Sequence, residues 1–364
     1  MRQKVLAIIG ILVVLSALGG AVAAGGETRQ LVFAGIEMGP FLILAILAQL
    51  GERRLWARIL TYFWLVMLVL ALAIVIVGMT WSALSSPTAP TDGPTAVEGL
   101  LQILIAMLGA FVLAATLLFR VVRNQVARVL PIDPHSLMHK VALFYIIYFA
   151  ISSFAQLAVL HGQPSLLAQV DQLGDTGRSS DGQLLDMFYG LAWTLPMALI
   201  AAGYPIRRSI RQAVVRLGFT VPTRWQLLAG VLLAFALVFI FTGVDRVISL
   251  VWTAMGWSVT NEAAFKKLMG AGFSPLGALA VGITAGIGEE ATTRGLLQPR
   301  LGKLLPNLAF AGAHAFQYGF DALLSVFLMG MILAFVRART STTIAALVHG
   351  GYDFLSIIAD YVGI

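Results

Sequence analysis

The stretch GITAGIGEEATTRGLL, Gly282 to Leu297, places two adjacent carboxylates and a guanidinium inside an otherwise apolar segment. These charges belong to Glu289, Glu290 and Arg294. Charged side chains are costly inside a lipid bilayer, and those that occur there are usually paired and functional. If this segment lies in a membrane, the function of the protein has to be sought around these three residues.

The composition of the whole chain indicates a membrane protein. Of its 364 residues, 59% are hydrophobic and 11% are charged, whereas soluble domains carry roughly 45–50% apolar and about 25% charged residues. We therefore expect an all-α fold, a polytopic transmembrane helix bundle of about ten to eleven spans. The chain has no cysteine, which excludes disulfides, thiol nucleophiles and cysteine metal sites.

Apolar runs that could cross a bilayer, which takes about 20 residues, or slightly shorter ones inside a bundle, recur along the chain. They cover residues 5–24, 31–50, 59–79, 98–119, 141–160, 186–204, 226–248, 276–296, 306–320, 321–337 and 342–361. The first run also fits a cleavable signal peptide, because it follows a basic start and ends in small residues. We favour a retained first helix, since a multispan protein does not need a cleaved signal.

The basic residues alternate between the loops. Every second loop is rich in them, whereas the loop SSPTAPTDGPTAVEG, residues 85–99, contains none. Positive loops face the cytoplasm, so we expect a cytoplasmic N-terminus if the first run is retained, and an outside C-terminus, in a bacterial inner membrane. The formal charge of +7 lies largely in these short loops, so nucleic acid is not an expected partner. The basic loops contain Arg53, Arg54 and Arg58; Arg120, Arg123, Arg128 and Lys140; Arg207, Arg208, Arg211, Arg216 and Arg224; Arg300 and Lys303; Arg337 and Arg339.

One outside loop departs from this alternation. The segment TNEAAFKKLMGAG, residues 260–272, contains Lys266 and Lys267. It predicts a short helix that is capped by Thr260 or Asn261 and stopped by Gly270, with its apolar face on the membrane surface. Late in the preceding run, Asp245 is expected to pair or to extend outward.

Two further polar pieces follow the opening stretch, FAGAH at Phe310–His314 and HGGYD at His349–Asp353. With a rise of 1.5 Å per residue, Glu289, His314 and His349 each lie about 10–12 Å from the cytoplasmic end of their runs. Three helices thus place an acid and two imidazoles in one membrane layer. Chance would scatter such residues over different depths.

The spacing of these residues along each helix indicates their separate roles. Glu290 and Arg294 are four apart, so they share a helix face and can form an ion pair. Glu289 is rotated by about 100° from Glu290, and it is therefore free to act as a base. His349 and Asp353 are also four apart, so the carboxylate can hold the ring and fix its tautomer.

The order EExxxR, FxxxH and HxxxN/D on successive hydrophobic runs resembles the CPBP family, the CAAX proteases and bacteriocin-processing enzymes, also called the ABI family. The resemblance covers about residues 226–360, most firmly 285–353, and Asp353 stands where the family uses Asn or Asp. It divides the chain into residues 1–224, an N-terminal membrane region of about six spans with no assigned role, and 225–364, a CPBP-like intramembrane protease domain.

This resemblance implies an intramembrane endopeptidase of the glutamate type. Glu289 and His314 would activate a water, while His349 and Asp353 would stabilise the oxyanion. Glu290 with Arg294 would shape the site, and Phe310 would line its wall. The expected partners are the lipid bilayer and a membrane-embedded or lipid-modified protein or peptide, cleaved near the cytoplasmic face. The sequence sets no oligomeric state.

Two alternatives remain open at this stage. Glu289, His314 and His349 form a sufficient zinc set with an open position, whereas the first interpretation needs no cofactor. A transporter or non-catalytic scaffold would instead have acids such as Glu37 and Asp245 along a path through both faces. A protease predicts a single cavity, closed to the outside, with its polar groups at one depth.

Overall fold

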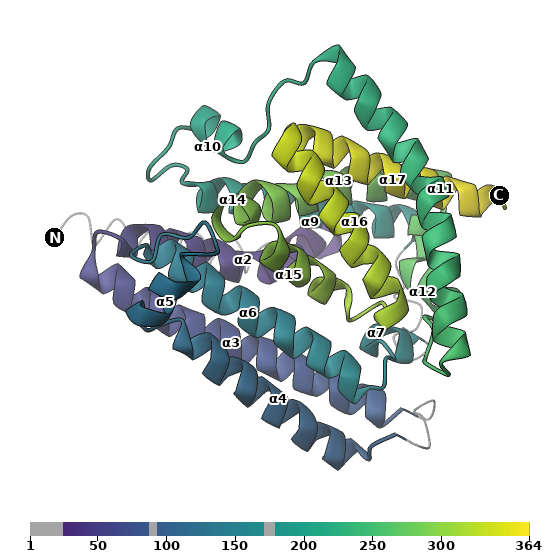
Figure 1. Ribbon diagram of the computed structural model, residues 1–364, viewed down its shortest axis with the longest axis horizontal. Coiled ribbons are helices and arrows are strands. Elements are labelled where there is room, and N and C mark those ends of the chain that lie inside the picture. Colours follow the sequence, from purple (N-terminus) through teal and green to yellow (C-terminus); the bar gives the residue numbers. More distant parts are fainter. Residues whose placement is uncertain (1–24, 87–92, 171–178, 364) are drawn as a thin grey trace.

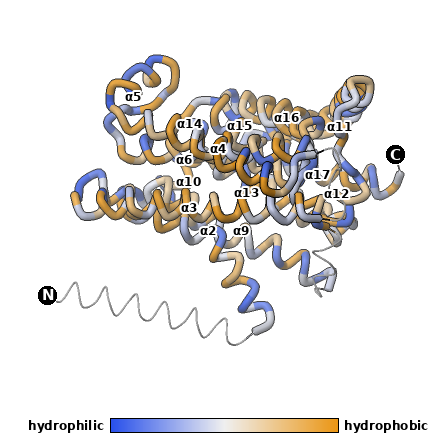
Figure 2. Tube along the Cα trace, turned by 90° about the horizontal axis from the view of Figure 1, so that it is seen from below, coloured by the Kyte–Doolittle hydropathy of each residue, from blue (hydrophilic) through white to orange (hydrophobic). Residues whose placement is uncertain are grey.

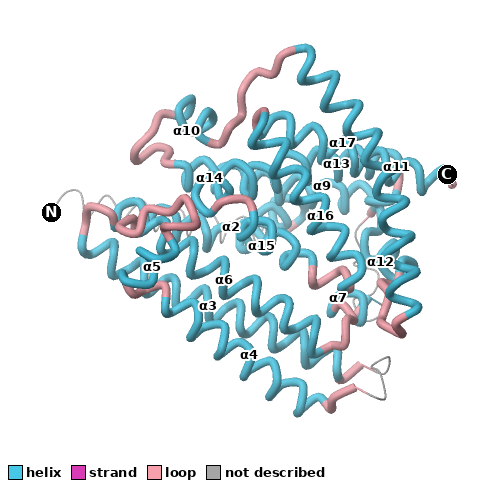
Figure 3. Tube along the Cα trace, in the orientation of Figure 1, coloured by secondary structure: helices cyan, strands magenta, loops and turns pink. Residues whose placement is uncertain are grey.

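The structure, a computed structural model, describes residues 25–86, 93–170 and 179–363. Within these ranges all regular structure is helical, with no β-strand (Figure 3). Eight helices are long and apolar enough to cross a membrane, and a bent pair makes a possible ninth. The all-α polytopic bundle is therefore confirmed, whereas the predicted run at 5–24 lies outside the described residues.

The helices of the first half pack against one another. Helix α2 packs along α9 and α3, and α4 packs along α6. Helices α2, α3, α4 and α6 share a core built largely of Leu, Ile, Val and aromatic side chains, whereas α9 and α10 share a second core with Ala291 of the second half. The helices are α2 (Gly26–Gly51), α3 (Leu55–Leu84), α4 (Ala96–Thr116), α5 (Arg120–Val126), α6 (Leu137–Val159), α7 (Ser165–Ala168), α9 (Ser180–Ala202) and α10 (Ile210–Arg216).

The second half wraps around the pair α13 and α17, which make the most extensive helix contact in the described chain. The elements are α11 (Arg224–Ala254), α12 (Glu262–Met269), η1 (Gly270–Phe273), α13 (Pro275–Glu290), η2 (Ala291–Leu297), α14 (Gln298–Leu301), α15 (Leu304–His314), α16 (Phe320–Arg339) and α17 (Thr342–Val362). Helix α15 also packs on α6, and α13 on α9. The helices before and after residue 224 thus share one bundle, and the division into two domains stays a prediction.

The two ends of the bundle differ in charge. Short helices α5, α10 and α14, which carry five of the arginines of the basic loops, lie at the left of Figure 1. Helices α7 and α12 and the C-terminal end of α17 lie at its right. Between these ends the helices are mostly hydrophobic (Figure 2). We call the left end the basic end, and the right end the opposite end.

The run predicted at 306–320 is helical only in its first part. Helix α15 has 11 residues, so it is about 16 Å long, well short of the hydrocarbon thickness of about 30 Å. The chain then continues as an irregular turn whose backbone finds other partners: the Phe316 carbonyl accepts from the N–H of Leu166, and the Gly319 N–H donates to Thr260 Oγ1. Such backbone is tolerated at membrane depth where protein covers it or where it lines a cavity.

Glycines set the distance between α13 and α17. A Cβ atom at Gly350 would lie 2.1 Å from the Gly282 carbonyl oxygen, and one at Gly282 would lie 2.5 Å from the Gly350 carbonyl oxygen. A Cβ at Gly286 would lie 2.7 Å from the Ala346 carbonyl oxygen. Small residues allow this close helix approach in membranes, and here it brings the polar residues of both helices together.

We expect Gly350→Ala to destabilise the protein by about 1–3 kcal/mol, the usual range for overpacking a tight contact. The new methyl group would force α13 and α17 apart. The matched control is Gly243→Ala on α11, where a Cβ meets nothing within 4 Å and alanine is the better helix former. Thermal unfolding in detergent checks both variants, and an equal response of the two would contradict the packing argument.

Candidate active site

The opening stretch ends α13 at Glu290 and continues as the π-helix η2, Ala291–Leu297. Pro299, in α14, lacks an N–H for the carbonyl four residues earlier, and its ring would clash with that carbonyl in a regular α-helix. A wider turn before it is therefore favourable, and π-turns frequently occur at functional sites. The sequence analysis did not anticipate this π-helix, although Pro299 was the available signal.

The two glutamates face different surroundings. Glu289 lines a cavity, and its side chain is 37% exposed. Glu290 is fully buried, and its Oε1 lies 3.0 Å from Nη1 of Arg294, which is buried too. A carboxylate and a guanidinium that are both withdrawn from solvent have to be paired to be tolerated. The expected Glu290–Arg294 pair is thus present in the structure.

Arg294 is fixed by further contacts that the sequence did not reveal. Its Nη2 donates to the Gly330 carbonyl at 3.0 Å, and its guanidinium carbon lies 4.5 Å from the centroid of the Phe310 ring. Asn307 donates to the Phe327 carbonyl in the same helix, α16. Gly330 makes room for this arrangement, since a Cβ there would lie 1.9 Å from Asn307 Oδ1. The Glu290–Arg294 pair is therefore held against α16, with the Phe310 ring over the guanidinium.

His349 lies among three carboxylates. Its Nδ1 is 3.0 Å from Glu290 Oε1, in a hydrogen bond. Its Nε2 is 3.5 Å from Asp353 Oδ2 and 3.9 Å from Glu289 Oε2. An ionised carboxylate can only accept, so Nδ1 carries the proton toward Glu290. The group that orients this ring is thus Glu290, a contact across helices that the local spacing to Asp353 did not predict.

His314 ends α15, and its tautomer follows from one contact. Nδ1 lies 2.8 Å from the Phe310 carbonyl oxygen, which can only accept, so Nδ1 is the protonated nitrogen. Nε2 is then left as an acceptor in the neutral ring. The ring stacks on Tyr318 at 5.9 Å between centroids, and Tyr318, which lies in the irregular turn four residues further on, is a site residue that the sequence analysis missed.

Glu289, His314, His349 and Asp353 all line one cavity of about 540 Å³. Phe310 lines it as well, as expected. Among the described residues, Glu289 Oε2 is a buried oxygen without a hydrogen-bond partner, and a water could bridge it to a nearby imidazole. The structure therefore brings the predicted residues from α13, α15 and α17 to a single place.

Asp245 also lines this cavity and accepts a hydrogen bond from Ser325. Asp245 thus has a partner on α16, one of the two arrangements expected for it. The predicted surface helix is confirmed as α12, with Asn261 as its cap and Gly270 at its end. Its Phe265 lines the cavity and packs on the Tyr318 ring, 4.7 Å between centroids, so part of its apolar side faces the cavity, and its place on the membrane surface stays a prediction.

The cavity extends toward the opposite end. There it is lined by Glu262 and Lys266 of α12 and by Asp360 near the end of α17. The side chains of Lys266 and Asp360 are 45% and 42% exposed, and they form an ion pair of 2.6 Å. At this end the cavity is lined by exposed side chains, so it is not closed there, and the side of the membrane that this end faces stays a prediction.

A zinc site requires three side chains that converge on one point at about 2 Å. Within the described ranges, no three His, Asp or Glu side chains are placed to hold a metal ion. The geometry does not fit the zinc alternative, and we derive no step through a metal.

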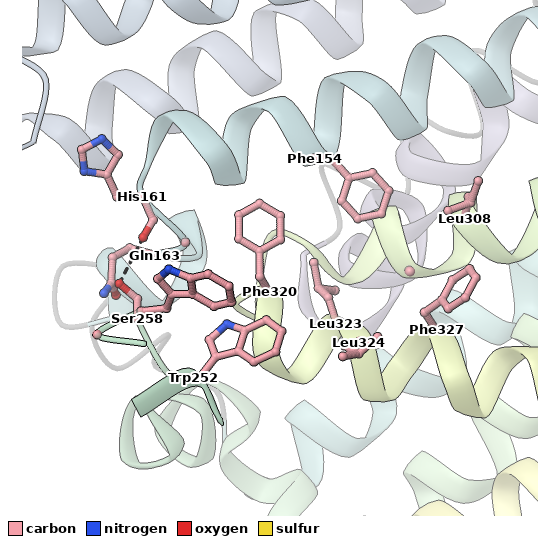
Figure 4. Close-up of a pocket in the computed structure, with 14 residues that line it drawn as sticks. Phe154, His161, Gln163, Trp252, Ser258, Leu308, Phe320, Leu323, Leu324 and Phe327 are labelled. Atoms are coloured by element: carbon pink, nitrogen blue, oxygen red, sulfur yellow. Dashed lines mark hydrogen bonds between the residues drawn. The ribbon is translucent and has the colours of Figure 1, made fainter. Parts of the chain in front are cut away.

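A second, larger cavity of about 920 Å³ lies on the other face of α15 and α16. Figure 4 shows its wall of apolar and aromatic side chains, with Trp252, Phe320 and Phe327 among them. Its polar end is formed by His161 and Ser258, whose hydroxyl donates to the His161 carbonyl. It contains no carboxylate and so lacks the combination of acid and imidazole found in the smaller cavity, which is the candidate active site.

Fold and site together define a polytopic membrane protein with an acid–imidazole cavity between its helices, an arrangement suited to hydrolysis. Residues 271–355 match the family described as type II CAAX prenyl endopeptidase Rce1-like. Over these residues the resemblance to the CAAX proteases is confirmed, and this part of the chain is classed with membrane proteases. The match includes every predicted site residue. Comparison with curated proteins and with solved structures found no match.

Proposed function

We propose that the protein is an intramembrane glutamate-type endopeptidase that hydrolyses a peptide bond in a membrane-embedded or lipid-modified substrate. One observation carries the proposal: Glu289, His314, His349 and Asp353, from three helices, line one cavity. A carboxylate and imidazoles at hydrogen-bonding reach of a common space supply a base, an acid and an oxyanion donor. The family match over residues 271–355 supports the same class of reaction.

In the proposed reaction, Glu289 takes a proton from a water that His314 Nε2 orients. The water oxygen attacks the carbonyl carbon, and the carbonyl π electrons move to the oxygen. Nε2–H of the doubly protonated His349, assisted by Asp353, donates to this oxyanion. When the tetrahedral intermediate collapses, the C–N bond breaks and Glu289 passes its proton to the leaving amine, so protons and electrons balance without a cofactor.

Glu290 has a positioning role in this proposal. Its hydrogen bond to Nδ1 of His349 turns Nε2 toward the cavity, and Arg294 keeps Glu290 ionised. Oriented donors stabilise an oxyanion well because they need no reorganisation during the reaction. The Glu290–Arg294 pair therefore acts through His349, without touching the substrate.

The alternative of a transporter has less support. Its acids should line a path that reaches both faces. The cavity ends at the buried Glu290–Arg294 pair, whose side chains are 0% and 1% exposed. Glu37, on α2, is not among the residues that line it.

Metal chelation separates the two protease mechanisms. Membranes containing the full chain are incubated with other membrane proteins, and new peptide termini are quantified by mass spectrometry. We expect cleavage to continue unchanged in the presence of a strong zinc chelator, because no described metal ligand set exists. A zinc metalloprotease in the same membranes provides the control for chelation. Loss of cleavage that added zinc restores would support the zinc alternative instead.

A further inference from the structure

Four arginines from separate elements gather at the basic end, where Figure 1 shows α10 and α14. Two of them bind the C-terminal end of α9. Arg208 Nη1 donates to the Ala202 carbonyl. Arg300 Nη2 donates to the carbonyl one residue earlier, at Ala201, at 3.2 Å. The two guanidiniums therefore share a helix end that carries only about half a negative charge.

The other two arginines, Arg216 and Arg337, lie beside this pair. A Cβ atom at Gly218, two residues after Arg216, would lie 2.8 Å from Arg337 Nη2. Burial lowers the pKa of the Arg216 guanidinium, and the charges of Arg208 and Arg337 lower it further. The chain is fixed here, because the N–H of Thr342 in α17 donates to the Gly218 carbonyl at 3.0 Å. The fold thus holds like charges together.

Arg216 and Arg337 have no partner for their charges. Both residues are half-buried, and in the described part of the chain neither forms a hydrogen bond or an ion pair. Arg337 Nε is a buried donor without an acceptor. The carboxylates of Glu52 and Asp133, at the same end, accept hydrogen bonds from residues 135–138 instead. Buried donors without acceptors are costly, and an anion between the guanidiniums would supply both acceptors and charge.

The position of the cluster indicates which anion it suits. The spanning helices α9 and α16 end here, and α11 and α17 begin here, so the cluster lies at the level of the lipid headgroups. Guanidiniums match the oxygens of a phosphate group and donate to them in pairs. Basic pockets between membrane helices bind the headgroups of anionic lipids.

We propose that these four arginines form a binding site for a phosphate group, which an anionic phospholipid or free phosphate supplies. The site is separate from the candidate active site, and the inference does not depend on the proposed function.

Thermal unfolding of the full chain in dodecyl maltoside without phosphate tests the site. Three additions are compared: phosphatidylglycerol, a glycosyl diacylglycerol with the same acyl chains and no phosphate, and inorganic phosphate against sodium chloride of equal ionic strength. A ligand of the folded protein raises the midpoint of unfolding. We expect a rise with phosphatidylglycerol, inorganic phosphate or both, and none with the glycosyl lipid. A rise with phosphatidylglycerol alone identifies a headgroup site, and a rise with inorganic phosphate identifies a site that accepts the free anion.

Variants separate the cluster from the general positive charge of this end. Arg216→Gln should raise the concentration of the phosphate compound that gives half the shift about tenfold, the loss of one hydrogen bond to a charged group. Arg337→Gln should act similarly from another helix. Without ligand both variants should fold, since neither side chain gives up a hydrogen bond within the described chain. Arg211→Gln is the matched control, because it removes an exposed arginine from the same helix as Arg216.

Three results would overturn the proposal. The first is that neither phosphate compound raises the midpoint of the wild type. The second is that the glycosyl lipid raises it as much as phosphatidylglycerol, which would indicate binding of acyl chains alone. The third is that Arg211→Gln weakens the response as much as Arg216→Gln, which would indicate attraction by the overall charge of this end.

Discussion

Glu289→Gln is expected to lower peptide-bond hydrolysis by about 10²–10⁴-fold, the usual contribution of a positioned general base. Glutamine keeps the size of the side chain but cannot take a proton from water. The folded protein should be no less stable, because within the described chain Glu289 Oε2 has no hydrogen bond to lose. The measurements are the rate at which new peptide termini appear in membranes, and thermal unfolding in detergent.

Glu262→Gln is the matched control for this variant. Glu262 lines the same cavity at its exposed rim, so the substitution removes the same charge at a distance from the reacting groups. Its cleavage rate should stay close to that of the wild type. A Glu289→Gln protein that folds and still cleaves at the normal rate would rule out Glu289 as the base.

Arg294→Met is expected to destabilise the protein by about 3–5 kcal/mol, because it removes the guanidinium partner of the buried Glu290 carboxylate. Glu290 and Arg294 have side-chain exposures of 0% and 1%, so water cannot compensate, and His349 is then shared among Glu290, Asp353 and Glu289 without the help of Arg294. The hydrogen bond from His349 to Glu290 should be disturbed as well, and cleavage should fall with stability. Denaturant unfolding in mixed micelles gives the free energy of unfolding.

The double variant Glu290→Gln with Arg294→Met distinguishes an unpaired charge from lost packing. It removes both charges, so it should be more stable than Arg294→Met alone, as contacting residues are not additive. Arg246→Met on α11 removes an exposed arginine and should have little effect. A double variant as unstable as the single one would show that the packing of Arg294 matters more than its charge.

The sequence predicted the parts of the site that depend on helical spacing. Glu290 and Arg294 are four residues apart, and their pairing follows from the period of a helix. The common depth of Glu289, His314 and His349 followed from counting residues along the apolar runs. Asn261 and Gly270 bound α12 because capping is a local property of the backbone.

Contacts between different helices could not be predicted from residue spacing. The hydrogen bond between His349 and Glu290 depends on how closely α13 and α17 approach, which Gly282 and Gly350 determine. Hydropathy also could not show that α15 ends at His314, since an irregular turn made of apolar residues has the same hydropathy as an apolar helix. The lining of the cavity comes from α11, α12, α13, α15, α16 and α17, and no single segment encodes it.

Glu290 and Arg294, buried and paired, form a seal behind the candidate active site, and this seal has an electrical consequence. Carboxylates and imidazoles among the lining residues give the cavity the polar partners that water needs, and a water column would bring the potential of the adjacent solution down to His349. A membrane voltage then falls mainly across the remaining sealed layer, about 10 Å thick instead of about 30 Å, so the field there is about threefold steeper. A single charge in that layer would feel about 2.3 kcal/mol per 100 mV. Because the two side chains have opposite charges 3.0 Å apart, the forces on them nearly cancel, and the seal should hold its shape when the cell is energised.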